Sequence, residues 1–236
     1  MTRRSTPAAY LLLARVSNLP TIWTNVLAAA ALAGGLEHAA CVAWIALTMS
    51  LIYSAGMWMN DACDAEFDRR ARADRPIPRG EVSVSEVWTG VVVMAGFSAA
   101  VLWAADVHRD VWRWWLALSA AISYYNVRHK RDPFGPLAMG LCRGLVFGVT
   151  ASAITGFVST AVLVGGGVMT AYVLALTFIG KSLGPRAGRI MPKLIAGISL
   201  LDAVLIVASG APLWLAAVGV AGFLTTLAAQ RLVSGT

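Results

Sequence analysis

The sequence predicts an all-α membrane protein, a polytopic bundle of about eight transmembrane helices. Hydrophobic residues make up 58% of the 236 positions, charged residues make up only 13%, and the mean hydropathy is +0.70. A soluble domain carries roughly 25% charged residues, so this chain has too little charge to cover a water-exposed surface. A bilayer-spanning helix takes ~20 mostly apolar residues, so eight spans would use about two thirds of the chain. We therefore expect residues 1–236 to form a single transmembrane domain.

Recurrent apolar runs define the expected spans. Their ranges are 21–36, 39–59, 88–105, 112–127, 136–155, 158–180, 193–209 and 212–233. Helices are expected rather than strands, because hydrocarbon offers no hydrogen-bond partners to an exposed backbone. Within the fifth run, Gly140, Gly144 and Gly148 recur every four residues. Small residues at this spacing predict a ridge for close helix packing.

The basic residues predict how the chain is oriented in the membrane. Most of the 19 Lys and Arg residues lie near the ends of the chain or in and beside the loops 60–87, 126–135 and 181–192. The exceptions are Arg109, Arg113 and Arg143. Cytoplasmic loops of membrane proteins carry an excess of Lys and Arg, so both termini and these three loops are predicted to be cytoplasmic. Orientation and phosphate binding explain the net charge of +7, and no nucleic-acid partner is expected.

The segment Trp58 to Gly80, WMNDACDAEFDRRARADRPIPRG, places a cluster of carboxylates where the second span meets the cytoplasm. At 100° per helical residue, Asp64 lies about 60° from Asp61 around the helix, and Asp68 lies about 20° from it. Carboxylates on one face repel one another, and a hard divalent cation with oxygen ligands relieves that repulsion. Mg²⁺ typically bridges such groups to substrate phosphates. The predicted site is a metal–diphosphate clamp; a solvated acidic loop neutralised by its arginines is the alternative.

Other polar residues are candidates for the same site. Lys130, in the segment YYNVRHKRDPFGPLAMGLCRG from Tyr124 to Gly144, offers a point charge to a diphosphate on the same predicted side. Arg143 lies roughly 10 Å inside the fifth span, where an Arg is costly enough to be a functional candidate. A structural ion pair, with Asp202 as partner, is the alternative for Arg143. Asn25 and Arg15, in and before the first span, either bind substrate or serve helix packing and lipid headgroups.

Three segments together resemble the UbiA-type family of membrane prenyltransferases. The first is Asn60-Asp61-x2-Asp64-x3-Asp68 followed by Arg75-Pro76 and Gly80, which is similar to the first aspartate motif of that family. YYNVRHKR (124–131) looks like its Tyr/Lys loop, and RVSNLPTIWTN (15–25) looks like its first-helix signature. The resemblance covers roughly residues 15–200. GPLAMGLCRGL (135–145) is similar to the family member found in bacterial ebo-type gene clusters.

The resemblance implies a helical bundle in the bacterial inner membrane, with a central cavity that opens toward the cytoplasm. It implies Mg²⁺-dependent transfer of a prenyl group from an isoprenyl diphosphate to a small-molecule, usually aromatic, acceptor. It assigns the roles as follows: metal binding to Asp61, Asp64 and Asp68; support of the metal site to Asn60; diphosphate binding to Lys130 and Arg72; and a cavity-facing position to Tyr124 or Tyr125.

The chain departs from the family pattern at the second aspartate motif. No acidic residue occurs from Pro133 to Leu201, and the corresponding loop, GKSLGPRAGRIMPK (180–193), is basic. A second Mg²⁺ would lack ligands there, and Lys181 is instead a candidate to bind phosphate or an anionic acceptor. Eight spans are also one fewer than the nine usual in the family.

This departure leaves two alternatives open: a carrier that binds a polyprenyl phosphate without chemistry, and a terpene cyclase that uses the first motif alone. A CDP-alcohol phosphotransferase is disfavoured, because Ala65-Glu66 follows Asp64 where that class requires Gly.

Overall fold

The computed structural model describes residues 6–128 and 132–233, and its regular structure in these ranges is helical throughout. The α-helices are α1 (Pro7–Leu13), α2 (Leu19–Ala33), α3 (Ala39–Ala71), α4 (Val84–Ala104), α5 (Val111–Arg128), α6 (Gly135–Thr155), α7 (Thr160–Leu183), α8 (Ala187–Ala208) and α9 (Leu213–Ala229). Helices α2 to α9 match the eight predicted spans to within six residues at every end but one, the C-terminal end of α3. The all-helical fold is therefore confirmed.

Six of the described helices are long and apolar enough to cross a membrane: α2 together with the turn before it (Val16–Ala33), α3, α4, α6, α7 and α8. Helix α9 is apolar but shorter. Helix α5 has 18 residues and includes Arg113 and Arg128, which lower its hydropathy. The chain is an integral membrane protein, in which eight long helices are present and six meet the criterion for a span.

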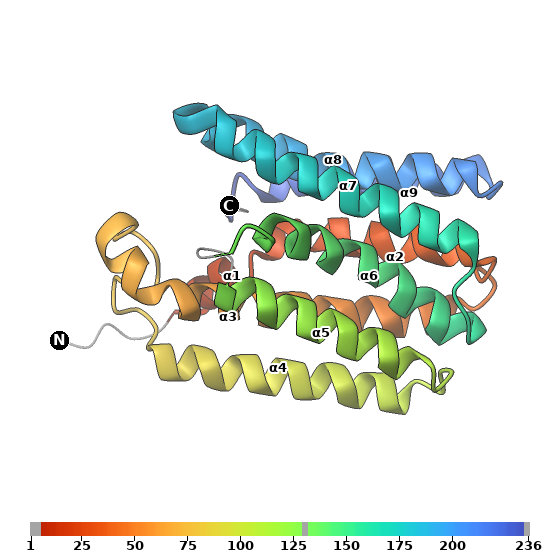
Figure 1. Cartoon of the computed structure of the whole chain (residues 1–236), viewed down its shortest axis with the longest axis horizontal. Helices are drawn as coiled ribbons and strands as arrows, with labels where there is room; N and C mark the ends of the chain where they lie inside the picture. The colour runs from red at the N-terminus through yellow and green to blue at the C-terminus, as the bar shows by residue number, and fades with distance from the viewer. Residues whose placement is uncertain (1–5, 129–131, 234–236) are drawn as a thin grey trace.

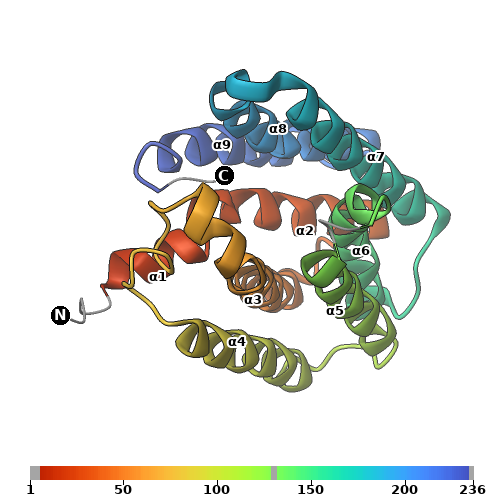
Figure 2. The ribbon, with the colours of Figure 1, turned by 60° about the vertical axis from the view of Figure 1, so that its left-hand side comes forward.

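Helix α2 lies at the centre of the bundle. It contacts α3, α6, α7, α8 and α9, and ten of its 15 residues are buried. In Figure 2, α8 and α9 lie together on one side of α2, and α3 and α4 lie on the other side. Polar side chains on α2 therefore sit between the two halves of the protein, not against lipid.

The connections between helices divide between the two ends of the bundle. Figure 1 shows the α3–α4 and α7–α8 connections at one end, together with α1 and the C-terminal end of α5. The α2–α3, α4–α5, α6–α7 and α8–α9 connections lie at the other end. The loops that contain most of the basic residues thus share one end of the molecule.

Helix α3 extends well beyond its predicted span. The sequence suggested a membrane segment that ends at residue 59, but the helix continues to Ala71. Residues 60–71 form three further turns, so the motif is helical and its periodicity brings the three aspartates to one face. The helix ends before Pro76, and Arg72 caps it with non-helical dihedral angles (φ −145°, ψ 61°). Arg72 therefore lies outside the regular helix, and helical periodicity does not place it on the face of the aspartates.

The glycine ridge on α6 makes the close packing that its spacing predicted. A Cβ atom on Gly140 would lie 2.7 Å from the carbonyl oxygen of Thr170, and one on Gly144 would lie 2.7 Å from that of Gly166. Both carbonyl groups belong to α7, so its backbone approaches α6 closely at these positions. Gly148 instead faces the ring of Trp114 on α5. The ridge thus fixes α6 between its two sequence neighbours.

Candidate active site

The three aspartates of the motif are buried near the C-terminal end of α3. Asp61, Asp64 and Asp68 are only 6%, 7% and 1% exposed. Helix α1 and the loop after α3 cover this region, because Ala9 and Leu13 belong to the same apolar cluster as Ile77 and Val82. The arrangement excludes the alternative of a solvated acidic loop.

Two arginines neutralise the acidic cluster. One guanidinium nitrogen of Arg75, Nη1, donates to Asp61 Oδ1 at 2.7 Å and to Asp68 Oδ2 at 2.9 Å. Arg15 Nη2 donates to the same Asp61 oxygen at 3.3 Å. Arg15 has left-handed backbone dihedrals (φ 45°, ψ 48°), which are uncommon for a residue with a side chain. This strained turn between α1 and α2 directs its guanidinium toward α3.

Arg75 was not among the candidate site residues, although it belongs to the quoted motif. It lies seven residues beyond Asp68 and outside the helix, so helical periodicity gave no reason to place it on the aspartate face. The loop after Arg72 turns back toward α3 (Figure 1). Arg75 in this loop pairs with the carboxylates of Asp61 and Asp68. The signal that would have found it is charge balance, since buried carboxylates require a counter-charge.

The oxygen donors of the acidic cluster suit a metal ion that is shared with a substrate. Within residues 6–128 and 132–233, no three His, Cys, Asp or Glu side chains are grouped so that they would hold a metal ion by themselves. However, Asp68 Oδ1 is buried and has no hydrogen-bond partner in the described part of the chain. Mg²⁺ is usually held by one or two carboxylates together with waters and substrate phosphates. The residues present fit that kind of shared site.

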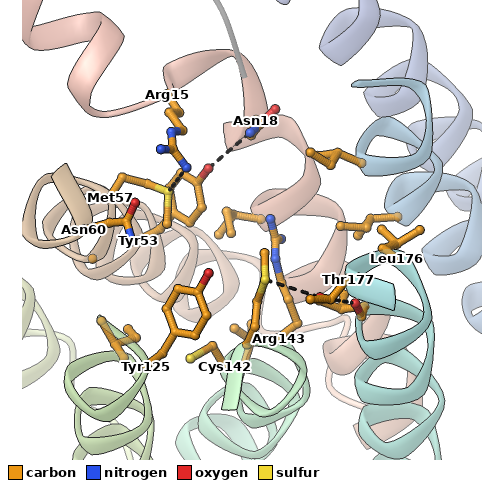
Figure 3. Close-up of a pocket in the computed structure, with 18 of the residues that line it drawn as sticks. Arg15, Asn18, Tyr53, Met57, Asn60, Tyr125, Cys142, Arg143, Leu176 and Thr177 are labelled. Carbon is orange, nitrogen blue, oxygen red and sulfur yellow. Dashed lines mark hydrogen bonds between the residues drawn. The ribbon is translucent and has the colours of Figure 1, made fainter. Parts of the chain in front are cut away.

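An apolar cavity of about 400 Å³ lies beside the acidic cluster. Its lining comes mainly from α2, α3, α5, α6, α7 and α8 and is mostly apolar (Figure 3). The polar side chains that reach it are those of Arg15, Asn18, Tyr53, Asn60, Tyr125, Asn126, Arg143, Thr177 and Lys181. Asn60 precedes Asp61, so the rim of the cavity adjoins the carboxylates. The arrangement suits a molecule with a charged head and an apolar body.

Asn60 and Asn126 join α3 to α5 at this rim. Asn60 Nδ2 donates to Asn126 Oδ1 at 3.1 Å, and Asn126 Nδ2 donates to the carbonyl oxygen of Gly56, also at 3.1 Å. Sequence reasoning selected Asn60 but missed Asn126, which lies in the quoted YYNVRHKR segment. A polar amide among the apolar residues of a span was the available signal.

The predicted residues of the α5–α6 region have different surroundings. Tyr125 lines the cavity, whereas Tyr124 is 39% exposed and donates a hydrogen bond to Asp132. That hydrogen bond, with a second from the backbone N–H of Phe134, lowers the pKa of Asp132. Lys130 lies outside the described residues. Arg72 is exposed and does not line the cavity.

A second polar cluster lies in the interior of the bundle. Arg143 Nη1 donates to the carbonyl oxygen of Thr21 at 3.2 Å and to Asn25 Oδ1 at 3.1 Å, and its Nη2 donates to Thr21 Oγ1 at 2.9 Å. Asn25 Nδ2 and Thr24 Oγ1 donate to the two carboxylate oxygens of Asp202 at 2.7 and 2.6 Å. Asp202 and Asn25 are fully buried. Asn25 therefore links Arg143 to Asp202, and it supports the cavity wall without reaching the cavity itself.

The basic segment 180–193, where α7 meets α8, contributes one charged residue to the cavity. Lys181, near the end of α7, is exposed at the surface and also lines the cavity with Gly180 and Met191. No acidic side chain on α6 or α7 faces it, because residues 133–201 contain none. The cavity rim thus has an acidic side on α3 and a basic side on α7.

Fold and cavity together define a class of protein: an intramembrane helical bundle with an apolar chamber beneath a charged rim. A sequence profile of the UbiA prenyltransferase family matches residues 19–235. The chain belongs to this family, as the three motifs predicted.

Individual relatives match over shorter segments. A digeranylgeranylglyceryl phosphate synthase from Methanoculleus marisnigri is 32% identical over 112 residues, which cover 44% of this chain and 37% of the relative. A 4-hydroxybenzoate octaprenyltransferase from Paracidovorax citrulli is 30% identical over 152 residues, which cover 63% of this chain and 48% of the relative. The matches thus span less than half the length of these two relatives.

Solved structures share the fold along nearly the whole chain. A digeranylgeranylglyceryl phosphate synthase structure has a TM-score of 0.60 at 16% identity and covers 95% of this chain and 87% of its own. A UbiA homologue from Archaeoglobus fulgidus, bound to DMAPP and Mg²⁺, has a TM-score of 0.58 at 16% identity, with coverage of 94% and 86%. At this identity, the similarity establishes the shared bundle.

Proposed function

We propose that the protein is a Mg²⁺-dependent prenyltransferase that moves a prenyl group from an isoprenyl diphosphate to a small-molecule acceptor in the membrane. The observation that carries this proposal is the position of the acidic cluster. Three buried carboxylates with two arginines adjoin the rim of an apolar cavity of about 400 Å³. Family membership supports it, as do relatives named as prenyltransferases and a structural neighbour bound to DMAPP and Mg²⁺.

Each group then has a defined task. Mg²⁺ would be held by one or two carboxylates among Asp61, Asp64 and Asp68 together with substrate phosphate. Asn60 joins α3 to α5 at the rim of the cavity through its hydrogen bond to Asn126. Bound Mg²⁺ supplies charge that stabilises the departing diphosphate. Arg15 and Arg75 already lie within hydrogen-bond distance of the carboxylates, so they are positioned to bind diphosphate oxygens. Lys130 and Lys181 add cationic charge to the same head group.

The apolar lining contributes to the bond-making step. The C1–O bond of the donor breaks, and its electron pair leaves with the diphosphate. The aliphatic walls exclude water from the allylic cation that remains, and the rings of Tyr53 and Tyr125, which line the cavity, offer π-faces to it. The acceptor then forms the new bond to C1 and loses a proton.

A non-catalytic carrier of polyprenyl phosphates is the second candidate. The absence of acidic residues from 133 to 201 favours it, because a second metal would have no carboxylate there. A terpene cyclase would use the same acidic cluster and cavity. We also propose that both termini and the basic loops face the cytoplasm of a bacterial inner membrane. This orientation is compatible with all three functions.

One experiment separates these functions. The purified protein is incubated with labelled C10, C15 and C20 diphosphates, Mg²⁺ and a mixture of aromatic acceptors. A transferase releases diphosphate and labels the acceptor, a cyclase releases diphosphate and labels a hydrocarbon or alcohol, and a carrier releases none. Binding of all three donors without diphosphate release would overturn the proposed enzyme.

A further inference from the structure

The feature that carries a further inference is the guanidinium of Arg143 on the cavity wall. Figure 3 shows its side chain directed from α6 into the space between Tyr53 and Leu176. The guanidinium carbon lies 5.6 Å from the centre of the Tyr53 ring. This cation thus borders the space that a substrate would fill, although it lies well inside the bundle.

Arg143 is held in one orientation and still has hydrogen-bonding capacity. A guanidinium has five N–H donors, and three are used toward Thr21 and Asn25. In the described part of the chain, the remaining two N–H groups have no hydrogen-bond partner. The acceptor groups that fix Arg143 belong to α2, on one side of it, while the cavity lies on another. The geometry is that of a fixed fork with donors left for a ligand.

The charge of Arg143 is only indirectly balanced. Among the described residues it has no ion pair within 4 Å, and the nearest carboxylate in its network, Asp202, is separated from it by the amide of Asn25. A cation on the wall of an apolar cavity would repel the allylic cation of the proposed reaction. A ligand with a carboxylate would neutralise it and would match the planar fork with two parallel hydrogen bonds.

The depth of Arg143 distinguishes this ligand from the donor diphosphate. Its ring partner, Tyr53, precedes Asp61 by eight residues of one continuous helix, which corresponds to about 12 Å along the axis. The diphosphate belongs at the acidic cluster, and the prenyl chain has no group that accepts a hydrogen bond. The second substrate is the remaining candidate.

We propose that Arg143 binds a carboxylate of the acceptor, and that Asn25 and Asp202 are positioning residues that hold its guanidinium toward the cavity. The inference rests on the proposed prenyl transfer and adds the chemical class of the acceptor: a small molecule with an anionic carboxylate, bound beside the ring of Tyr53. A neutral acceptor of the same shape would leave the cation of Arg143 uncompensated.

The test uses 4-hydroxybenzoate as the probe and 4-hydroxybenzamide as its uncharged isostere. Their binding to the purified full chain is measured by calorimetry in detergent with Mg²⁺. We expect the wild-type protein to bind the carboxylate at least about tenfold more tightly than the amide, because hydrogen bonds to charged groups are the stronger ones. In Arg143→Gln this preference disappears. Arg113→Gln is the control, because Arg113 is exposed and pairs with Asp110 away from the cavity.

Equal binding of the two probes to the wild-type protein, binding of neither, or an unchanged preference in Arg143→Gln would each overturn the inference. If Arg143→Gln does not fold, Arg143→Lys replaces it. That variant retains the charge but not the fork, so we expect it to keep the preference for the carboxylate while binding it about tenfold more weakly. Wild-type affinity in Arg143→Lys contradicts the proposed fork.

Binding of geranyl diphosphate, measured in parallel, separates this inference from the proposed function. We expect Arg143→Gln to bind it as the wild-type protein does. Failure of the wild-type protein to bind geranyl diphosphate would count against prenyl transfer, whereas loss of donor binding only in Arg143→Gln would count against the separate acceptor site.

Discussion

The acidic cluster on α3 and the Arg143 cluster inside the bundle show two ways to bury charge in a membrane protein. In the acidic cluster, opposite charges touch: Arg75 and Arg15 lie 2.7 and 3.3 Å from the same oxygen of Asp61. In the Arg143 cluster they do not, because Asn25 separates Arg143 from Asp202. We propose that the direct pairs near the end of the bundle are exchanged for a metal and a diphosphate when the donor binds. The interior pair of Arg143 and Asp202, linked through the amide of Asn25 and called the relayed pair below, holds the guanidinium of Arg143 in place.

The comparison predicts the largest effect for the acidic cluster. Asp61→Ala and Asp64→Ala are expected to lower turnover by about 100- to 1,000-fold, since each removes charge that acts on the departing diphosphate. Both variants should still insert and fold, as judged by gel filtration in detergent. Glu66→Ala is the matched control, because Glu66 lies on the same helix but is exposed and forms ion pairs with the exposed Arg69 and Arg70. Full activity in excess chelator would refute the role of the metal.

The substitution Arg75→Gln tests whether Mg²⁺ can replace the ion pairs that Arg75 makes with Asp61 and Asp68. Without Mg²⁺, Arg75→Gln leaves Asp61 and Asp68 short of a counter-charge and is expected to lower stability by about 1–3 kcal/mol. Addition of Mg²⁺ should restore most of the thermal stability, because the ion then neutralises the same carboxylates. Thermal unfolding with and without Mg²⁺ measures both effects, with Arg79→Gln as the exposed control. A loss of thermal stability that Mg²⁺ does not reverse would show that Mg²⁺ and the guanidinium of Arg75 do not neutralise the same carboxylates.

Asp202→Asn tests the relayed pair. The substitution keeps the shape of the side chain but removes the charge that orients Asn25, so we expect the KM for an acceptor to rise by about tenfold or less. The KM for the donor should stay unchanged, a separation that a merely structural defect would not produce. The matched control is Asp110→Asn, since that carboxylate is half-exposed. Equal rises in both KM values would argue for general loosening of the bundle.

Lys181 is expected to give the smallest effect. Its charge lies at the basic side of the rim and is exposed to solvent, so Lys181→Gln should raise the KM for the donor only about two- to threefold. Steady-state kinetics at two salt concentrations measure this, because an exposed charge is screened by salt. Arg189→Gln, in the first turn of α8 and outside the cavity lining, should leave the KM unchanged. A tenfold rise in the KM for the donor in Lys181→Gln would show that Lys181 contributes far more to donor binding than an exposed charge does.

Lys130 remains a prediction from sequence. We expect Lys130→Ala to weaken diphosphate binding more than it changes expression. An unchanged KM for the donor would contradict its assignment to the head group.

Local periodicity determined much of this protein in advance. The apolar runs placed the eight long helices, because a chain in hydrocarbon has to satisfy its backbone within each segment. The spacing of Asp61, Asp64 and Asp68 placed them on one helical face, and the glycines on α6 marked its contact with α7. Each of these features depends on residues within a single helix, so the linear sequence contains it.

Only the tertiary structure decided which distant groups meet. Arg75 reaches the aspartates because the loop after α3 folds back, and Arg143 reaches Asp202 through an amide on a third helix. The pairing of α2 with α6 and α8 brings residues about 120 and 180 positions apart into hydrogen-bond contact. No periodic pattern encodes such contacts, since they depend on how whole helices pack. The sequence thus determined the segments and the acidic face, and packing of the helices determined the cavity and its two charge clusters.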